Sequence, residues 1–154
     1  MNIIKKLCQK IKSHAQQGKS DWELVAWSIA WEGYVGVGEG NKYRRLKPVI
    51  IIGNTERELL EKMQKFAKGY GRIYGPQLKL KHKPMFIWQI YRLTEIKEVL
   101  ENIVQLIPST RKKEVVKLLL EFCNSRLTRF KKPYNDIERS IANKLIDLKP
   151  RNKN

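Results

Sequence analysis

Acidic side chains are scarce in this chain of 154 residues. Asp and Glu number 15 against 32 Lys and Arg, which gives a formal net charge of +17. A globular chain this basic usually binds a polyanion, because its own charge must be balanced by a partner of the opposite sign. A membrane surface is the competing partner, but the sequence has no dominant basic amphipathic helix and no lipidation motif. The balance of charge therefore favours a nucleic acid, and we expect no membrane partner.

Long hydrophobic runs are also absent. Uninterrupted apolar runs reach only four residues, as at residues 49–52, far short of the roughly 20 residues that cross a bilayer. The start of the chain lacks the apolar segment of a signal peptide. Cysteine is limited to Cys8 and Cys123, which match no zinc-binding spacing, and His14 and His82 form no cluster with them. So few cysteines are typical of a protein in a reducing compartment. We expect an intracellular protein, in the cytoplasm, the nucleoid or an organelle matrix, and not a secreted one.

The spacing of apolar residues predicts an α+β fold. Helical periodicity indicates helices over residues 1–19 and 20–31, and period-two alternation indicates two β-hairpins with a helix between them. Capping boxes at Ser20/Glu23 and Thr55/Glu58 predict where the second and third helices begin. Three more helices are expected, over about residues 95–106, 110–124 and 135–148.

The resulting core order is αββαββαα, with one helix added at each end. Two hairpins alternating with helices predict one four-stranded antiparallel sheet that has helices on one face and leaves the other face free. We expect a single domain over residues 1–154, with a core at about 20–125, an N-terminal helix at 1–19 and a basic C-terminal extension at 126–154.

The excess positive charge lies mainly on the two predicted hairpins. In "QLKLKHK" lysines alternate with other residues, so an extended strand would place three ammonium groups on one side. A basic sheet face with interleaved tyrosines suits a nucleic-acid backbone, although a solvated charged face is the alternative for any single lysine. The candidate nucleic-acid contacts are Tyr34, Gly36, Gly38, Lys42, Arg44, Arg45, Lys47, Arg72, Tyr74, Lys79, Lys81, Lys83 and Gln89.

The glycines of "GVGEGNK" fit no phosphate-binding template, because both the register and the helix-to-strand order differ from those of nucleotide loops. One interpretation is a flexible or bulged strand. The other is that Val35 and Val37 face the core, so that Gly36 and Gly38 face the nucleic acid and leave room for it.

Glu32 is the most informative single residue. It lies in the last turn of the second helix, where the helix dipole disfavours a carboxylate, and it directly follows the apolar residues Ile29, Ala30 and Trp31. A carboxylate between a buried helix end and a basic sheet face is placed to hold a divalent cation beside a phosphate. The alternative is a helix-end acid that pairs with a lysine.

The segment "VAWSIAWEG" resembles the motif of the LAGLIDADG homing endonucleases, with Glu32 and Gly33 at its acid–glycine end. The resemblance continues in order along the chain. "PVIIIGNTERELLEKM" is similar to the second strand and following helix of the family, "GRIYG" and "FIWQIYR" to its second hairpin, and "IPSTRKKEVVKLLLEF" to its lysine-rich turn and helix. Together these segments cover about residues 20–125.

The resemblance implies a site-specific endonuclease that cuts double-stranded DNA by metal-dependent phosphodiester hydrolysis under a saddle-shaped sheet. The chain has one copy of the motif, so a homodimer with a nearly palindromic target is implied. Mg²⁺ is the implied metal, Mn²⁺ would substitute for it, and Ca²⁺ would support binding without cleavage. The rival interpretation is a non-cleaving binder of the same fold, either an intron RNA maturase or a DNA-binding regulator.

The resemblance also implies roles for particular residues. By position, Glu32 and Gly33 would hold the metal, and Asn54 would help to place the attacking water. The basic residue near the scissile phosphate falls within Arg111, Lys112 and Lys113, with Lys112 and Lys113 left open. The dimer contact would use Ala26, Trp27, Ala30 and Trp31. The two tryptophans stand where the family often has small residues, and Ala26 and Ala30 could supply a small face instead.

Overall fold

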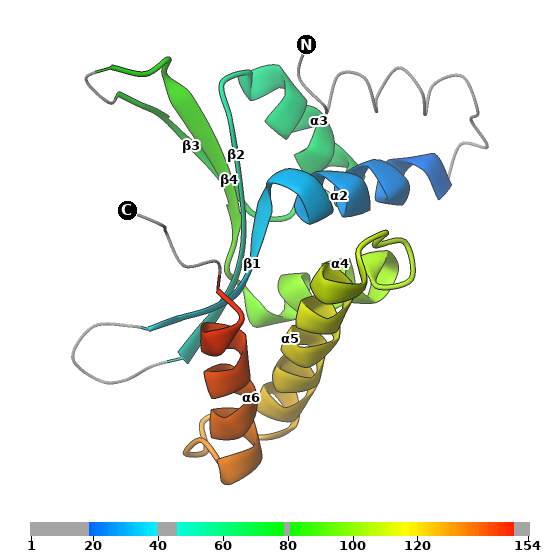
Figure 1. Ribbon diagram of the computed structural model, residues 1–154, viewed down its shortest axis with the longest axis vertical. Helices are drawn as coiled ribbons and strands as arrows, with labels where there is room; N and C mark the ends of the chain where they lie inside the picture. The colour runs from blue at the N-terminus through cyan, green and yellow to red at the C-terminus, as the bar shows by residue number, and fades with distance from the viewer. Residues whose placement is uncertain (1–18, 40–45, 79–80, 150–154) are drawn as a thin grey trace.

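The computed structural model describes residues 19–39, 46–78 and 81–149 (Figure 1). Its elements follow the expected order, including the C-terminal helix. They are α2 (Lys19–Glu32), β1 (Gly33–Glu39), β2 (Leu46–Asn54), α3 (Arg57–Phe66), β3 (Arg72–Gln77), β4 (Met85–Ile90), α4 (Leu93–Ile103), α5 (Thr110–Thr128) and α6 (Asp136–Asp147). The helix expected before α2 lies outside the described residues. None of the described helices combines the length and the apolar character needed to cross a membrane.

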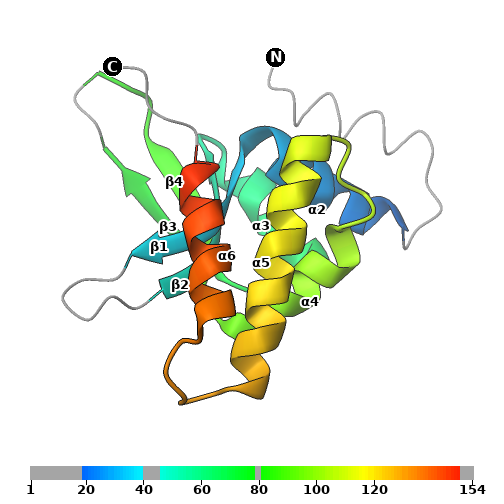
Figure 2. The same ribbon diagram turned by 60° about the horizontal axis from the view of Figure 1, so that its bottom comes forward.

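The four strands form one antiparallel sheet in the order β1-β2-β4-β3. The described helices lie on one side of this sheet, as Figure 1 shows, so the α+β architecture with one covered face is confirmed. Helices α5 and α6 lie side by side, and α6 also contacts the edge strand β1 (Figure 2). The end of the last helix is thereby brought next to the start of the first strand.

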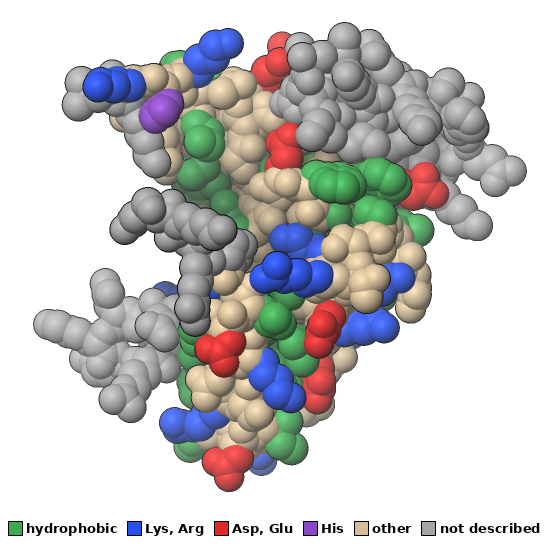
Figure 3. Space-filling view, in the orientation of Figure 1, with side chains coloured by type: hydrophobic (Ala, Val, Ile, Leu, Met, Phe, Trp, Pro, Cys, Tyr) green, Lys and Arg blue, Asp and Glu red, His purple; other side chains and the backbone are tan. Residues whose placement is uncertain are grey.

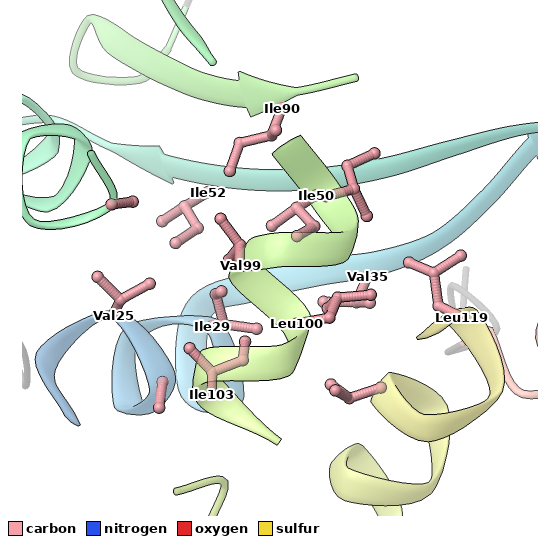
Figure 4. Packing of buried hydrophobic residues seen from close by; sticks show 14 of the residues in the cluster. Val25, Ile29, Val35, Ile50, Ile52, Ile90, Val99, Leu100, Ile103 and Leu119 are labelled. Carbon is pink, nitrogen blue, oxygen red and sulfur yellow. The ribbon is translucent and has the colours of Figure 1, made fainter. Parts of the chain in front are cut away.

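The core lies between the sheet and the helices. Figure 4 shows side chains from α2, β1, β2, β4 and α4 converging on one apolar cluster, including Val25, Ile29, Val35, Ile50 and Ile90, all of which are buried. From Ile50 to Asn54 buried and partly buried residues alternate in β2, and Ile50 and Ile52 face the helices. Burial of Val25 and Ile29 fixes the rotation of α2, and with it the position of the helix end.

Helix α2 passes into β1 without an intervening loop residue. A Cβ atom added to Gly33, the first residue of β1, would lie 2.7 Å from the Cα atom of Ile29. Such a contact is too close for any side chain, so only glycine allows the strand to leave the helix end at this angle. The acid–glycine pair therefore has a structural reason in this chain: Glu32 ends the helix and Gly33 makes the turn.

Two local expectations were wrong. Helix α3 begins at Arg57 after Glu56, whose side chain makes no capping hydrogen bond, so Thr55 and Glu58 do not form the predicted capping box. The extended strand expected through Lys81 and Lys83 is also not there. Gln77 already pairs with Met85, and the intervening residues must therefore supply the connection of the hairpin. Lys81 and Lys83 lie exposed in that connection.

Candidate functional site

Glu32 lies where the last turn of α2 meets β1. Its side chain is partly buried, and one carboxylate oxygen accepts a hydrogen bond of 3.5 Å from the side-chain amide of Asn54. Burial raises the pKa of Glu32 above its ordinary value, and the hydrogen bond from Asn54 acts in the opposite direction. A partly buried carboxylate with one neutral hydrogen-bond donor gains stability when a cation approaches it.

Asn54 ends β2 and is buried, with 6% of its surface exposed. Its side-chain oxygen accepts a hydrogen bond of 2.8 Å from the backbone N–H of Glu56. This local turn bond holds the amide group so that its NH₂ points toward Glu32. Asn54 therefore organises the turn before α3 and also faces the carboxylate, although Thr55 and Glu58 were expected to cap this helix.

Lys112 reaches the same place from the first turn of α5. Ser109 caps this helix by accepting a hydrogen bond from the Lys112 backbone N–H. The Lys112 Nζ atom donates a hydrogen bond of 2.8 Å to the Gly33 carbonyl oxygen, which lies 79 positions earlier in the chain. Burial lowers the pKa of Lys112, and the nearby charge of Arg111 lowers it further. An ammonium group in this state is poorly compensated and favours a nearby anion.

Glu32 and Lys112 line a pocket of about 380 Å³ at the junction of four elements, and Asn54 lies next to it through its hydrogen bond to Glu32. Of the cations left open by the sequence, Lys112 and Arg111 line the pocket and Lys113 does not. The end of α6 forms one wall of this pocket, although residues 126–154 were expected to be a basic extension outside the core. The lining residues are Ala30, Glu32, Gly33, Tyr34, Val35, Ser109, Arg111, Lys112, Val115, Leu145, Leu148 and Lys149.

The space expected above Gly36 is filled by the chain itself. A Cβ atom added to Gly36 would lie 2.6 Å from the hydroxyl oxygen of Tyr34, and Gly36 is buried. The Tyr34 ring is itself contacted from the end of the chain that follows α6: the Nζ atom of Lys149 lies 5.5 Å from the centre of this ring. The expectation that this glycine leaves room for a nucleic acid was therefore wrong, since the side chain two positions earlier folds over it. Gly38 is partly exposed.

The other predicted contacts that the structure describes lie on or beside the uncovered face of the sheet. Arg72 pairs with Gln89, and Tyr74 pairs with Ile87, so all four side chains share the face opposite to Trp88 and Ile90. Lys47 is exposed at the β1 end of this face, and Lys81 and Lys83 are exposed at the tip of the β3–β4 hairpin. Lys42, Arg44, Arg45 and Lys79 lie outside the described residues.

The exposed side of α2 differs from the predicted dimer contact. Ala26 is fully buried within the chain, so its assignment to a contact with a second copy was wrong. Trp31 is 58% exposed, and its ring centre lies 6.4 Å from that of the partly buried Trp27. Figure 3 shows hydrophobic side chains gathered on the surface over α2. Ala30 is partly buried at the edge of the pocket, which leaves the tryptophans as the main exposed feature of this helix.

No protein-family model and no curated protein matches this sequence. Solved structures do match the arrangement of its elements. The archaeal intron-encoded homing endonuclease I-Vdi141I, complexed with DNA, aligns at a TM-score of 0.69 and 18% identity over 88% of this chain and 87% of that chain. The homing endonuclease I-CvuI, complexed with its target in 2 mM Ca, aligns at 0.69 and 16% identity over 88% and 86%.

A third comparison adds the family by name: the LAGLIDADG homing endonuclease I-GzeII, with its DNA target, aligns at a TM-score of 0.62 and 18% identity. This chain has the LAGLIDADG homing endonuclease fold. The resemblance found in the motif is thus confirmed at the level of the fold. The alignment with I-GzeII covers 83% of this chain and 43% of that chain, so one copy of this chain corresponds to less than half of that LAGLIDADG protein.

Proposed function

We propose that this protein is a site-specific, metal-dependent double-stranded DNA endonuclease that acts as a homodimer. The observation that carries the proposal is that Glu32 and Lys112 line one pocket at the end of α2, and that Asn54 donates a hydrogen bond to Glu32. A carboxylate, an amide and an ammonium group are the side chains that metal-dependent phosphodiester hydrolysis needs at hand. They come from three separate segments of the chain.

The donor atoms at this pocket suit Mg²⁺ or Mn²⁺. Among the described residues there is no cluster of three His, Cys, Asp or Glu side chains that could hold a metal alone. Mg²⁺ is typically bound by one or two carboxylates together with substrate phosphates. Glu32 would supply one carboxylate from each chain, and the DNA would supply the remaining oxygens. The Gly33 carbonyl, assigned to the metal from the sequence, accepts the hydrogen bond from Lys112 in this structure, which leaves Glu32 as the principal proposed ligand.

Each side chain has a separate task in this proposal. The bound cation would stabilise charge on the attacking and leaving oxygens. Glu32 holds its negative charge at the helix end, and Asn54 fixes the orientation of that carboxylate. Lys112, anchored at the start of α5, stabilises the charge that develops on the phosphate. Arg111 donates a hydrogen bond of 3.5 Å to the Leu148 carbonyl, so it both ties α6 to the pocket and adds positive charge at its edge.

A second copy of the chain would complete the enzyme. The fold of this chain spans 87% of I-Vdi141I but only 43% of I-GzeII, as expected for one unit of a two-unit arrangement. Trp27 and Trp31 lie on the side of α2 that would meet the second copy. Glu32 follows Trp31 directly, so pairing of two α2 helices would bring both carboxylates toward one DNA site.

The proposal is tested by selection and cleavage. Duplexes enriched from a random library by the wild-type protein in Ca²⁺ are incubated with the protein in Mg²⁺, and both strands are analysed for cuts. Glu32→Gln keeps the size of the side chain and removes its charge, so we expect binding in Ca²⁺ within about threefold of wild type and a loss of cleavage of 100-fold or more. A wild-type protein that enriches a duplex and never cuts it, in Mg²⁺ or Mn²⁺, would rule out the endonuclease.

A non-cleaving binder of the same fold remains the second candidate, because of one observation. Trp27 and Trp31 are bulky side chains on the side of α2 that would have to approach its twin. If they hold the helices apart, the two carboxylates do not share a site, and the protein binds DNA or intron RNA without cutting. The same selection experiment, repeated with an RNA library, distinguishes a DNA-binding regulator from a maturase.

A further inference from the structure

The uncovered face of the sheet has an apolar centre. In β2 the side chain of Ile51 points away from the helices, because its neighbours Ile50 and Ile52 are buried on the helix side. In β4 the same alternation places Ile87 on the uncovered face, opposite to Trp88. The two central strands of the sheet are thus apolar on both faces, which is the pattern of a sheet that is covered on both sides.

Met85 and Tyr74 extend this centre into a patch, which we name the sheet patch: Ile51, Ile87, Met85 and Tyr74. A Cβ atom added to Gly53, which follows Ile51 on the same face, would lie 2.9 Å from the Met85 sulfur. Tyr74 pairs directly with Ile87. Met85 is 37% exposed and Tyr74 is 43% exposed, and Figure 3 shows hydrophobic side chains at the surface beside the β3–β4 hairpin.

The surroundings of the sheet patch are positively charged. Arg72, Lys47, Lys81 and Lys83 flank it, and all four are exposed. The only acidic residue in the described strands is Glu39, the last residue of β1. An apolar centre with a cationic rim requires a partner that is anionic at its edge and apolar at its centre.

Duplex DNA meets both requirements. Phosphates border its major groove, and the C5-methyl group of thymine is the apolar group that this groove displays. RNA fits less well, because uracil lacks this methyl group and the A-form major groove is deep and narrow.

We infer that the sheet patch reads thymine methyl groups in the major groove of the target, with Ile51 and Ile87 as its central contacts. This inference rests on the proposed function, since it requires a duplex DNA target. It assigns direct base readout to apolar side chains at the centre of the sheet. Arg72 and Gln89, which pair with each other next to Ile51, then provide the hydrogen-bonding contacts on the same row.

The test replaces thymine by deoxyuridine, which removes the methyl group and leaves base pairing unchanged. Each thymine of the selected duplex is substituted in turn, and Kd is measured with wild-type protein in Ca²⁺. We expect at least one position in each half-site at which the loss of the methyl group weakens binding about fourfold, as burial of one such group predicts. Other thymines should show no change.

Protein variants assign the effect to the sheet patch. Ile51→Thr and Ile87→Thr keep the β-branched shape that strands favour, and their folding is checked by thermal melting. Each should bind the thymine and deoxyuridine duplexes equally at the position that it contacts. Ile137→Thr is the matched control, because Ile137 is 62% exposed and belongs to the first turn of α6 and not to the sheet, and it should keep the full sensitivity of wild type.

The outcomes separate this inference from the proposed function. If no duplex is enriched, the proposed DNA target fails. If a duplex is enriched and cut but tolerates deoxyuridine at every position, methyl readout is wrong and the endonuclease stands. That result would also be expected if the patch is covered by a protein partner. The inference would also be overturned if both Ile51→Thr and Ile87→Thr still bound the deoxyuridine duplex more weakly than the thymine duplex. Other residues would then read the methyl group.

Discussion

At the scale of single residues, one ammonium group joins two distant parts of the chain. Lys112 extends from the first turn of α5 to the Gly33 carbonyl, directly after Glu32. Lys113, one position later, turns away from the pocket because successive helical side chains are about 100° apart. The sequence made these two lysines equivalent candidates, and the contact of Lys112 now gives them different expected roles.

The difference between the two lysines is testable by removing each charge. Lys112→Met should lower the single-turnover cleavage rate by about 100-fold, because it removes a charge placed beside the phosphate. Lys113→Met is the matched control, with the same change one position away, and it should stay within about threefold of wild type. Cleavage of the selected duplex at saturating protein, at one salt concentration, gives both rates. Equal losses in the two variants would contradict the assignment.

Site residues could be predicted from the sequence where the backbone allows only one residue type. Glu32 and Gly33 could be assigned to a helix end because an apolar helical pattern stops at a glycine. The resemblance implied that Asn54 helps to place the attacking water, and a capping role was set aside because Thr55 and Glu58 were expected to cap the helix; the structure instead gives Asn54 the turn bond from Glu56. Nothing in a sequence decides whether Thr55 or Asn54 makes such a bond, because both side chains can accept it at that spacing.

At the scale of elements, α2 carries both the proposed metal ligand and the proposed contact with a second copy. Ala26 is buried and Trp31 is exposed, so the side of α2 that is open to a second copy carries a tryptophan. A contact through the small residue Ala26 had been expected instead. The hydrophobic pattern of this helix was ambiguous, since apolar residues surround it almost completely. Only packing against the sheet and α4 decides which of them remain exposed.

We expect Trp31→Glu to separate the two copies. Sedimentation of wild type with the selected duplex should give protein of twice the 18.2 kDa chain mass. The variant should weaken this dimer by about 100-fold or more, because it removes a large apolar contact and places two like charges at the contact. Phe130→Glu is the control, since Phe130 is 69% exposed just beyond α5. A Trp31→Glu protein that still pairs and cuts normally would exclude α2 as the interface.

Helices α5 and α6 are joined by a buried carboxylate. Glu138 is fully buried and accepts hydrogen bonds from Ser125, Arg126 and the backbone of Asn135. Burial alone would raise the pKa of Glu138, but these hydrogen bonds together lower it. The pocket wall formed by the end of α6 depends on this joint, which could not be predicted because Glu138 looks in the sequence like any acid in the first turn of a helix.

Glu138→Gln should reduce the free energy of unfolding by about 3 kcal/mol, because Arg126 then keeps a mostly buried charge without its partner. Since the folded-state pKa is lowered, the contribution of Glu138 is complete above its ordinary value of 4.5 and is lost as the pH falls below it. The difference between wild type and variant in urea titrations should therefore shrink on acidification. Glu101→Gln, which breaks an exposed pair with Lys97, should cost about 0.5 kcal/mol or less.

At the scale of the whole molecule, the fold separates a helical side from an open sheet face. The order of elements was predictable because hydrophobic periodicity changes clearly from helix to strand. The connection at residues 78–84 was not, since lysines alternating with apolar residues are compatible with a strand. Only the pairing of Gln77 with Met85 sets where the strand ends. Composition indicated a polyanion, and the fold distributes that charge around the open face and the pocket.

The final prediction concerns this distributed charge. A dimer that neutralises about ten or more phosphates should show a slope near −9 or steeper in a plot of log K against log salt concentration. Arg72→Gln removes one cation per chain from the sheet face, so the slope should become shallower by about 2. Lys117→Gln, an exposed position on the helical side, should leave the slope unchanged. Fluorescence anisotropy with the selected duplex, in Ca²⁺ and at five or more salt concentrations, gives the three slopes. A wild-type slope shallower than about −3 would mean that the basic residues are solvated surface and that DNA is not the partner.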